Sequence, residues 1–129
     1  MSLANLNSVV KVLKSYTIPD TNLTDGVVQN LTSFIVPANS TVIVQGILDC
    51  GSAGTPTQYQ YGFSGVNNNF NIPTLIYTQN TSSTSFTGNV LNIFTNNTSN
   101  PQTYYLNAEF AFTGGITGIG GVLNVLQLS

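Results

Sequence analysis

Apolar and polar residues alternate along much of this chain, and no other sequence feature restricts its fold as strongly. Residues 58–63 (QYQYGF) place an aromatic side chain at every second position, and residues 103–113 (TYYLNAEFAFT) repeat the pattern. Successive side chains of a β-strand point to opposite faces of its sheet, so this period predicts strands with one buried face. No long segment combines the period of a helix with good helix formers, and we therefore expect an all-β protein. In the last of these strands the residues expected to face inward are Tyr104, Leu106, Ala108, Phe110 and Phe112.

Eight segments have the composition of strands and are separated by turns rich in Gly, Asn, Ser and Pro. They are residues 9–18, 31–36, 41–50, 58–63, 72–78, 89–95, 103–113 and 122–128. Short strands at such regular spacing favour a β-sandwich, and an eight-stranded antiparallel jelly roll is its natural arrangement. A chain of 129 residues suits one domain. We predict a jelly-roll-like, single-domain β-sandwich over residues 9–129, preceded by an N-terminal arm, residues 1–8.

Charged side chains are scarce, with two Lys, no Arg, four carboxylates and no His. Their place is taken by 17 Asn, 17 Thr, 12 Ser and 7 Gln. Binding to nucleic acid or to an anionic membrane requires clustered cations, so we expect neither partner. A surface of short neutral hydrogen-bonding groups suits contact with copies of the same chain or with a scaffold. The alternative is a small β domain in which Asn and Thr simply keep the surface hydrated.

The residues on which most enzymes depend are also few. Without His there is no His-based catalytic triad and no imidazole ligand for a metal. Residues 19–26 (PDTNLTDG) begin like a calcium-binding loop, but their Gly comes one position late and Leu31 stands where a bidentate Glu is expected. We expect these residues to form a turn, and we predict no enzymatic activity, no metal and no cofactor. The carboxylates are Asp20, Asp25, Asp49 and Glu109.

Cys50 is the only cysteine, so the chain cannot form an internal disulfide. It lies in an apolar segment, and we expect it to be a small buried side chain rather than a nucleophile.

Tyrosines and asparagines supply the candidates for contact with a ligand or partner. Tyr59, Tyr61 and Tyr105 could stack against sugars, although the absence of Trp favours packing in the core or in an interface. Asn68 lies in the segment 67–71 (NNNFN), and residues 96–101 (NNTSNP) are a second loop of this kind. Both could touch a glycan or a neighbouring subunit. The alternative is that they are ordinary exposed loops whose Asn residues adopt left-handed backbone angles.

Residues 114–121 (GGITGIGG) form the most unusual segment. They lack the spacing of a dinucleotide-binding motif, and they carry no charge. Glycine permits tight turns and close approach of backbones. Gly115, Gly118 and Gly120 could therefore lie near the axis of a symmetric oligomer, where bulky side chains do not fit. A flexible crossover between the last two strands is the alternative.

The N-terminal sequence MSLANLNSVVKVLKSY lacks a basic region followed by an apolar stretch, so we expect no signal peptide. No segment approaches the roughly 20 apolar residues that a membrane-spanning helix needs. We expect synthesis in a cytoplasm followed by placement through assembly. The six Asn-x-Ser/Thr sequons should then remain unmodified.

The sequence resembles small jelly-roll proteins of virions, namely capsid decoration proteins and fibre-head domains of phages and other icosahedral viruses. The residues that carry the likeness are 32–52 (TSFIVPANSTVIVQGILDCGS) and 102–115 (QTYYLNAEFAFTGG), with the low charge and the uncharged Gly-rich end. The resemblance implies a non-enzymatic structural protein of the virion that binds other copies of itself and a viral capsid protein.

Three functions remain open at this point. The first is a decoration or cement protein that stabilises an icosahedral capsid through protein contacts. The second is a receptor- or carbohydrate-binding head of a viral fibre or spike. The third is a subunit of a self-assembling filament, because segments such as 89–95 (NVLNIFT) can aggregate when exposed.

Overall fold

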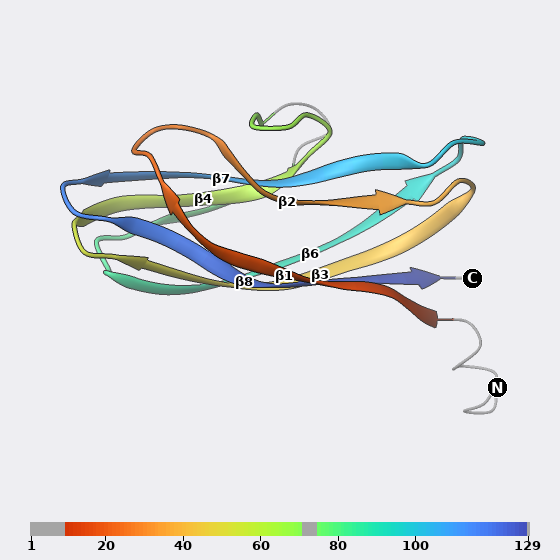
Figure 1. Cartoon of the computed structure of the whole chain (residues 1–129), viewed down its shortest axis with the longest axis horizontal. Helices are drawn as coiled ribbons and strands as arrows, with labels where there is room; N and C mark the ends of the chain where they lie inside the picture. The colour runs from red at the N-terminus through yellow and green to blue at the C-terminus, as the bar shows by residue number, and fades with distance from the viewer. Residues whose placement is uncertain (1–9, 71–74, 129) are drawn as a thin grey trace.

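In the part of the chain that the structure describes, eight antiparallel strands form two four-stranded sheets, and Figure 1 shows these sheets packed face to face. The computed structural model describes residues 10–70 and 75–128, so the predicted arm lies outside the described residues. The predicted all-β jelly-roll sandwich is confirmed. The strands are β1 (Val10–Leu23), β2 (Gln29–Val36), β3 (Ser40–Ser52), β4 (Thr55–Ser64), β5 (Leu75–Asn80), β6 (Ser85–Asn96), β7 (Gln102–Thr113) and β8 (Thr117–Leu128).

The strand order follows from one long folded hairpin that is rolled up. β1 pairs with β8, β2 with β7, β3 with β6, and β4 with β5. Two further ladders, β3 with β8 and β4 with β7, join these pairs into sheets of order β1-β8-β3-β6 and β2-β7-β4-β5. Consecutive strands therefore cross between the sheets, except for β4 and β5. This is the topology of a jelly roll.

The alternating pattern of the sequence places one face of each sheet in the core. In β3, Val42, Val44 and Leu48 are fully buried, whereas Ile47 and Asp49 on the opposite face are exposed. In β7, the alternation also holds as predicted, because Leu106, Ala108 and Phe110 are buried and the inward-facing Tyr104 and Phe112 pack against the core.

Aromatic side chains join the two sheets across the core. Phe34 of β2 lies 5.3 Å from Phe94 of β6 in the other sheet and 5.7 Å from Phe63 of β4 in its own sheet, both edge-to-face, measured between ring centroids. Tyr59 of β4 stacks on Phe86 of β6 in the other sheet at 5.5 Å and contacts Phe110 of β7 in its own sheet at 4.8 Å. Edge-to-face and offset pairs add stability beyond the area that they bury. The contact between the sheets therefore depends on the geometry of these aromatic pairs as well as on the apolar area that is buried.

The chain near Pro19 differs from the prediction, which placed Asp20 and Asp25 together in a loop. β1 continues to Leu23, so Asp20 lies in the strand. The register with β8 shifts between Ile18 and Thr21, which identifies a bulge. β1 is an edge strand, where a bulge accommodates a proline that has no N–H for the ladder. Asp25 does form the turn, since its Oδ1 accepts a hydrogen bond from the Phe112 N–H at 2.9 Å.

The prediction that residues 96–101 form an exposed loop is wrong for its first residue, Asn96. Asn96 is only 1% exposed, and its Nδ2 donates to the carbonyl oxygens of Val36, Pro37 and Asn100. Its Oδ1 accepts from the N–H and the hydroxyl of Thr98. The side chain thus ties the β2–β3 turn to the β6–β7 turn, which are also joined by a hydrogen bond from the Asn39 N–H to the Thr98 carbonyl oxygen at 3.0 Å. The remaining residues, 97–101, are exposed as predicted.

Replacing Phe34 with Ala should lower the free energy of unfolding by about 3–5 kcal/mol, because the ring fills the inter-sheet core and leaves a cavity. Ile35→Ala is the matched control. The Ile35 side chain is next to Phe34 in sequence, but it points outward and is 53% exposed. Its replacement should therefore lower the free energy of unfolding by less than about 1 kcal/mol. Urea titration followed by circular dichroism measures both. Equal losses would contradict the assignment of faces.

Candidate functional site

The outer face of the β1-β8-β3-β6 sheet carries a group of apolar side chains. We call it the outer apolar patch, and it consists of the exposed Ile47, Leu91, Ile93 and Val122 and the half-buried Ile43. Exposed fractions reach 48% for Ile47, 45% for Val122 and 59% for both Leu91 and Ile93. Single exposed apolar residues are normal on a protein surface, but a contiguous group is typical of an interaction site.

The sheet register makes this patch continuous. Ile47 lies opposite Val122 on β8, and Ile43 lies opposite Ile93 on β6. Leu91 lies opposite Gln45 and is therefore diagonal to both isoleucines of β3. Directly opposed residues on one face have Cβ atoms about 4.5–5.5 Å apart, so these side chains touch or nearly touch. Three strands from distant parts of the sequence build the patch together.

The free edge of the patch is held in place by a tyrosine. β6 is the outermost strand of its sheet, and the Tyr77 hydroxyl from β5 bonds to it twice. The hydroxyl donates to the Leu91 carbonyl oxygen at 2.8 Å and accepts from the Leu91 N–H at 3.0 Å. An edge strand whose polar groups are occupied in this way is less open to pairing with another strand. It also presents the Leu91 side chain from a fixed backbone.

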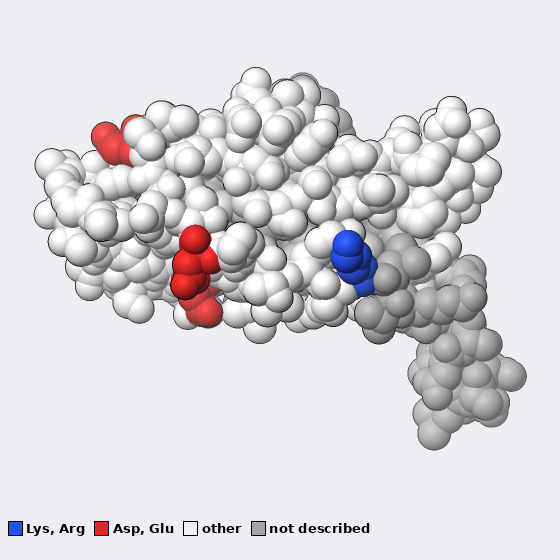
Figure 2. All heavy atoms as spheres, in the orientation of Figure 1, with Lys and Arg blue, Asp and Glu red and all other residues white. Residues whose placement is uncertain are grey.

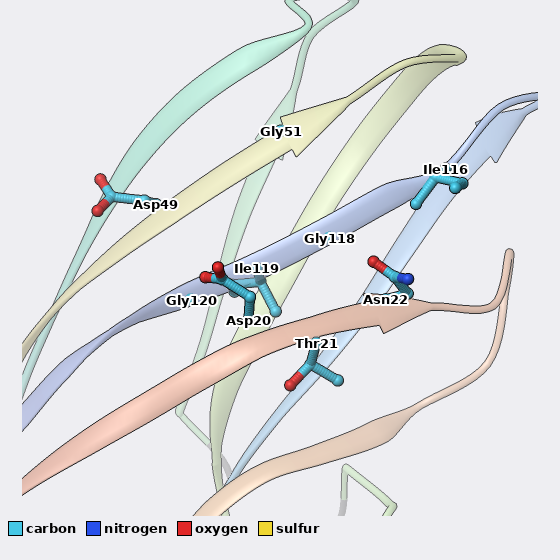
Figure 3. Close-up of a pocket in the computed structure, with 9 residues that line it drawn as sticks. All are labelled: Asp20, Thr21, Asn22, Asp49, Gly51, Ile116, Gly118, Ile119 and Gly120. Atoms are coloured by element: carbon cyan, nitrogen blue, oxygen red, sulfur yellow. The ribbon is translucent and has the colours of Figure 1, made fainter.

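An open depression of about 300 Å³ adjoins the patch at one end of the sheet. Figure 3 shows Gly118 and Gly120 of β8 at its floor, with Asp20 on β1 to one side and Asp49 on β3 to the other. The Asp20 carboxylate lies over β8, where a side chain at Gly120 would collide with it. The Asp49 carboxylate extends away from β8, so the two acidic groups do not converge on one point.

This arrangement offers little for catalysis or metal binding. Within residues 10–70 and 75–128, no three His, Cys, Asp or Glu side chains lie close enough to hold a metal ion together. General acid–base catalysis needs groups that converge on a reacting atom. The depression places Asp20 and Asp49 beside the outer apolar patch. That the protein uses no cofactor and catalyses no reaction stays a prediction.

The Gly-rich segment belongs largely to a strand and is not a flexible crossover. Gly118 and Gly120 lie in β8, between β1 and β3, so the sequence prediction began this strand too late. Gly115 lies in the β7–β8 turn with φ 65°, a backbone conformation that favours glycine, and it packs against Ala53. Close packing within the chain therefore accounts for Gly115 and Gly120. A place for them near an oligomer axis stays a prediction.

Two of the four predicted contact residues are buried in the structure. Tyr59 is 0% exposed and Tyr61 is 4% exposed, so neither ring is available at the surface for a sugar or partner. The Tyr59 hydroxyl donates to the Ser83 carbonyl oxygen at 2.7 Å, and Tyr61 stacks on Tyr77 at 5.6 Å. Both belong to the core, as the packing alternative anticipated.

The other two, Asn68 and Tyr105, lie on the outer side of the β2-β7-β4-β5 sheet. Asn68 is exposed and has φ 53°, and its Oδ1 accepts from the Asn30 N–H at 2.7 Å. Its loop is fastened to the sheet by Asn107, whose Nδ2 donates to the carbonyl oxygens of Val66 and Asn69. Tyr105 is half-buried in β7. A binding role for these two residues stays a prediction.

The sequence contained a signal for the outer apolar patch that the contact candidates missed. Segments 41–50 and 89–95 have apolar residues on both faces, at Ile43 and Ile47 in the first and at Leu91 and Ile93 in the second. A strand with one wetted face needs only one apolar set. The second set of apolar residues indicates a second apolar surface. The sequence does not show that these residues lie together, because that depends on the pairing register of the strands.

Charge is sparse around the whole molecule. Figure 2 shows a largely uncharged surface in the orientation of Figure 1, with charged atoms in a few separate groups. Lys14 lies with its Nζ 4.7 Å from the centroid of the Tyr16 ring. No helix in the described part of the chain could cross a membrane.

Similarity to known proteins is found in structure and not in sequence. No protein-family model matches the chain, and no curated protein matches it. One similar solved structure is that of infectious bursal disease virus, Gx strain, with a TM-score of 0.62 and 13% identity over 91% of this chain and 33% of that chain. The chain shares the jelly-roll fold of that structure. Another is the VP2 subviral particle of the same virus, with a TM-score of 0.57 and 14% identity over 91% of this chain and 32% of that chain.

The resemblance to jelly-roll proteins of virions, stated from the sequence, is thus confirmed at the level of the fold. This chain spans about a third of the length of the chains that it matches. At 13–14% identity the likeness establishes the architecture and leaves partners and activity to be proposed.

Cys50 should not react with Ellman's reagent at pH 8 in the folded protein. The thiol is 5% exposed, and burial, with a smaller contribution from the Asp49 charge, raises its pKa to about 12. Only the thiolate is nucleophilic, so reaction should follow unfolding. Because the folded pKa is raised above the ordinary value, this group also makes stability fall as pH rises from about 9 toward 12. Rapid labelling of the native protein at pH 8 would contradict this burial.

Proposed function

We propose that this protein is a structural, non-enzymatic component of a virion, and that it decorates and stabilises an icosahedral capsid. The observation that carries the proposal is the jelly-roll likeness over 91% of the chain to a virus structure and to a subviral particle. The described residues add a well-formed apolar contact surface and no convergent catalytic group. Its partners would be a viral capsid protein and other copies of itself, in a virion assembled from proteins made in the host cytoplasm.

The mechanism is burial of apolar and neutral polar area between subunits. The outer apolar patch supplies five aliphatic side chains from β3, β6 and β8 on a backbone that the Tyr77 hydroxyl steadies. Transfer of such groups from water provides the driving force, at about 25 cal/mol per Å² of apolar area. Little of the interface energy would come from Coulomb attraction, because Asp20 and Asp49 border the patch and do not enter it.

The alternative functions have less support. A carbohydrate-binding head would need exposed aromatic platforms, and the burial of Tyr59 and Tyr61 leaves only the half-buried Tyr105 among the candidates. A filament built by edge-to-edge strand pairing would need open sheet edges, and the Tyr77 hydroxyl occupies the backbone of β6 at Leu91. We therefore favour capsid decoration over a carbohydrate-binding head and over a filament subunit.

The protein should co-sediment with intact virus particles. Particles from the organism that carries this gene would be purified on a density gradient and probed with an antibody against the protein. We expect the protein in the particle fraction and, by immunogold microscopy, on the outer surface of capsids. Recovery only in the soluble fraction would refute a virion role.

Attachment to the particle should depend only weakly on salt. Raising NaCl from about 0.05 M to about 1 M shortens the screening length from over 10 Å to about 3 Å, which weakens contacts between exposed charges but not apolar burial. We expect the bound amount, measured by sedimentation and immunoblotting, to change less than about twofold. Complete release at 1 M NaCl would contradict an uncharged interface.

A further inference from the structure

Along β3 the outward-facing positions change character from one end to the other. They run from Thr41 through Ile43, Gln45 and Ile47 to Asp49. On the neighbouring strands, Leu91 lies beside Gln45 and Val122 lies beside Ile47, so the apolar middle extends onto both of them. The face therefore has an acidic end, an apolar middle centred on Gln45, and a hydroxyl end. At that last end the hydroxyls of Thr41 and Thr95 lie 3.1 Å apart.

We propose that the outer apolar patch binds the same patch on a second copy of this chain, across a two-fold axis. The axis lies between the two sheets, runs across their strands and passes close to Gln45. This inference rests on the proposed function and deepens it, because it names the partner of the patch. A two-fold contact requires a surface that complements itself, and charge and register supply that complementarity here.

The two-fold axis reverses one copy relative to the other along the strand direction. Ile47 of each copy then faces Ile43 of the other, and Leu91 faces Leu91 near the axis, while Ile93 comes opposite the polar Asn89. Asp49 faces Thr41, so a carboxylate meets a hydroxyl that can donate to it. The two Asp49 side chains end up about 27 Å apart, at roughly 3.3–3.4 Å for each residue of strand, which exceeds the screening length of about 8 Å at physiological salt.

Other symmetric arrangements fit less well. An axis parallel to the strands would bring Asp49 and Asp20 of both copies to the same end of the interface. Like charges placed opposite each other in a contact are destabilising. The charge pattern of the face thus selects the axis that runs across the strands.

Contact between the outer apolar patches of two copies is also more favourable than contact between the patch of one copy and the outer side of the β2-β7-β4-β5 sheet of another. The partner must offer an uncharged apolar surface, because the patch has no charged member within it. The outer side of the β2-β7-β4-β5 sheet presents Gln58, Gln60 and Glu109, and the loop around Asn68 covers part of it. Its exposed large apolar side chains are Ile35, at 53%, and Ile76 at the β5 edge, at 40%, and they stand apart on different strands. Two patches would pack at the spacing of about 10 Å that is usual for stacked sheets.

The test is the absolute mass of the purified full chain, measured by light scattering behind a sizing column. We expect a dimer for the wild type. Ile47→Asp places a carboxylate inside the apolar contact and should raise the dimer dissociation constant by at least about a hundredfold, giving a monomer. Ile35→Asp is the matched control on the other sheet and should stay dimeric. A monomeric wild type, or an oligomer that survives Ile47→Asp, overturns the proposal.

A crosslinking experiment decides the matter if Ile47→Asp does not fold. Leu91 lies beside Gln45, near the axis, so a Leu91→Cys variant brings two thiols face to face across the interface. A bismaleimide that spans about 10 Å should then yield a covalent dimer on denaturing gels. Ile35→Cys is the control and should stay monomeric, and the buried Cys50 should not contribute. Equal crosslinking of both variants refutes the interface. A protein that is monomeric in solution but present in virions would refute this inference and leave the proposed function standing.

Discussion

Contact between the two sheets is the interaction on which the rest of this structure depends. Every strand gives one face to a shared core, and aromatic rings from β2, β4, β6 and β7 close the space between the sheets. Cys50 is a free thiol, so burial rather than a disulfide holds the sandwich together. Because strands are pleated, fixing the inner faces also fixes which side chains face outward. The inter-sheet contact thereby determines which side chains form the outer apolar patch.

The two outer faces that result are chemically different. One carries the outer apolar patch, steadied at its edge by the Tyr77 hydroxyl. The other carries amides and hydroxyls and is partly covered by a loop that Asn107 fastens to the sheet. A contact formed through the first face gains its free energy from area and from fit. Its specificity comes from the position of side chains along strands, because charge is nearly absent from it.

Much of the fold could be predicted from local pattern, and the errors have physical causes. All eight predicted strands exist, and the inward set of β7 is the predicted one. β1 and β8 were predicted too short, because Pro19 and the glycines of residues 117–121 are typical of loops. In the folded chain a bulge on an edge strand accommodates Pro19, and the Asp20 side chain lies in the space over Gly120. Tertiary packing overrides the local preference in both places.

The sequence by itself determined that the chain is an all-β sandwich and that its surface carries little charge. These are properties of period and composition, and each strand expresses them alone. Only the tertiary structure decided the strand order, the burial of Tyr59 and Asn96, and the meeting of Ile47, Leu91 and Val122 on one face. The reason is that alternation tells a strand which face to bury but not which strand to pair with. Pairing is chosen by the packing of segments far apart in the chain.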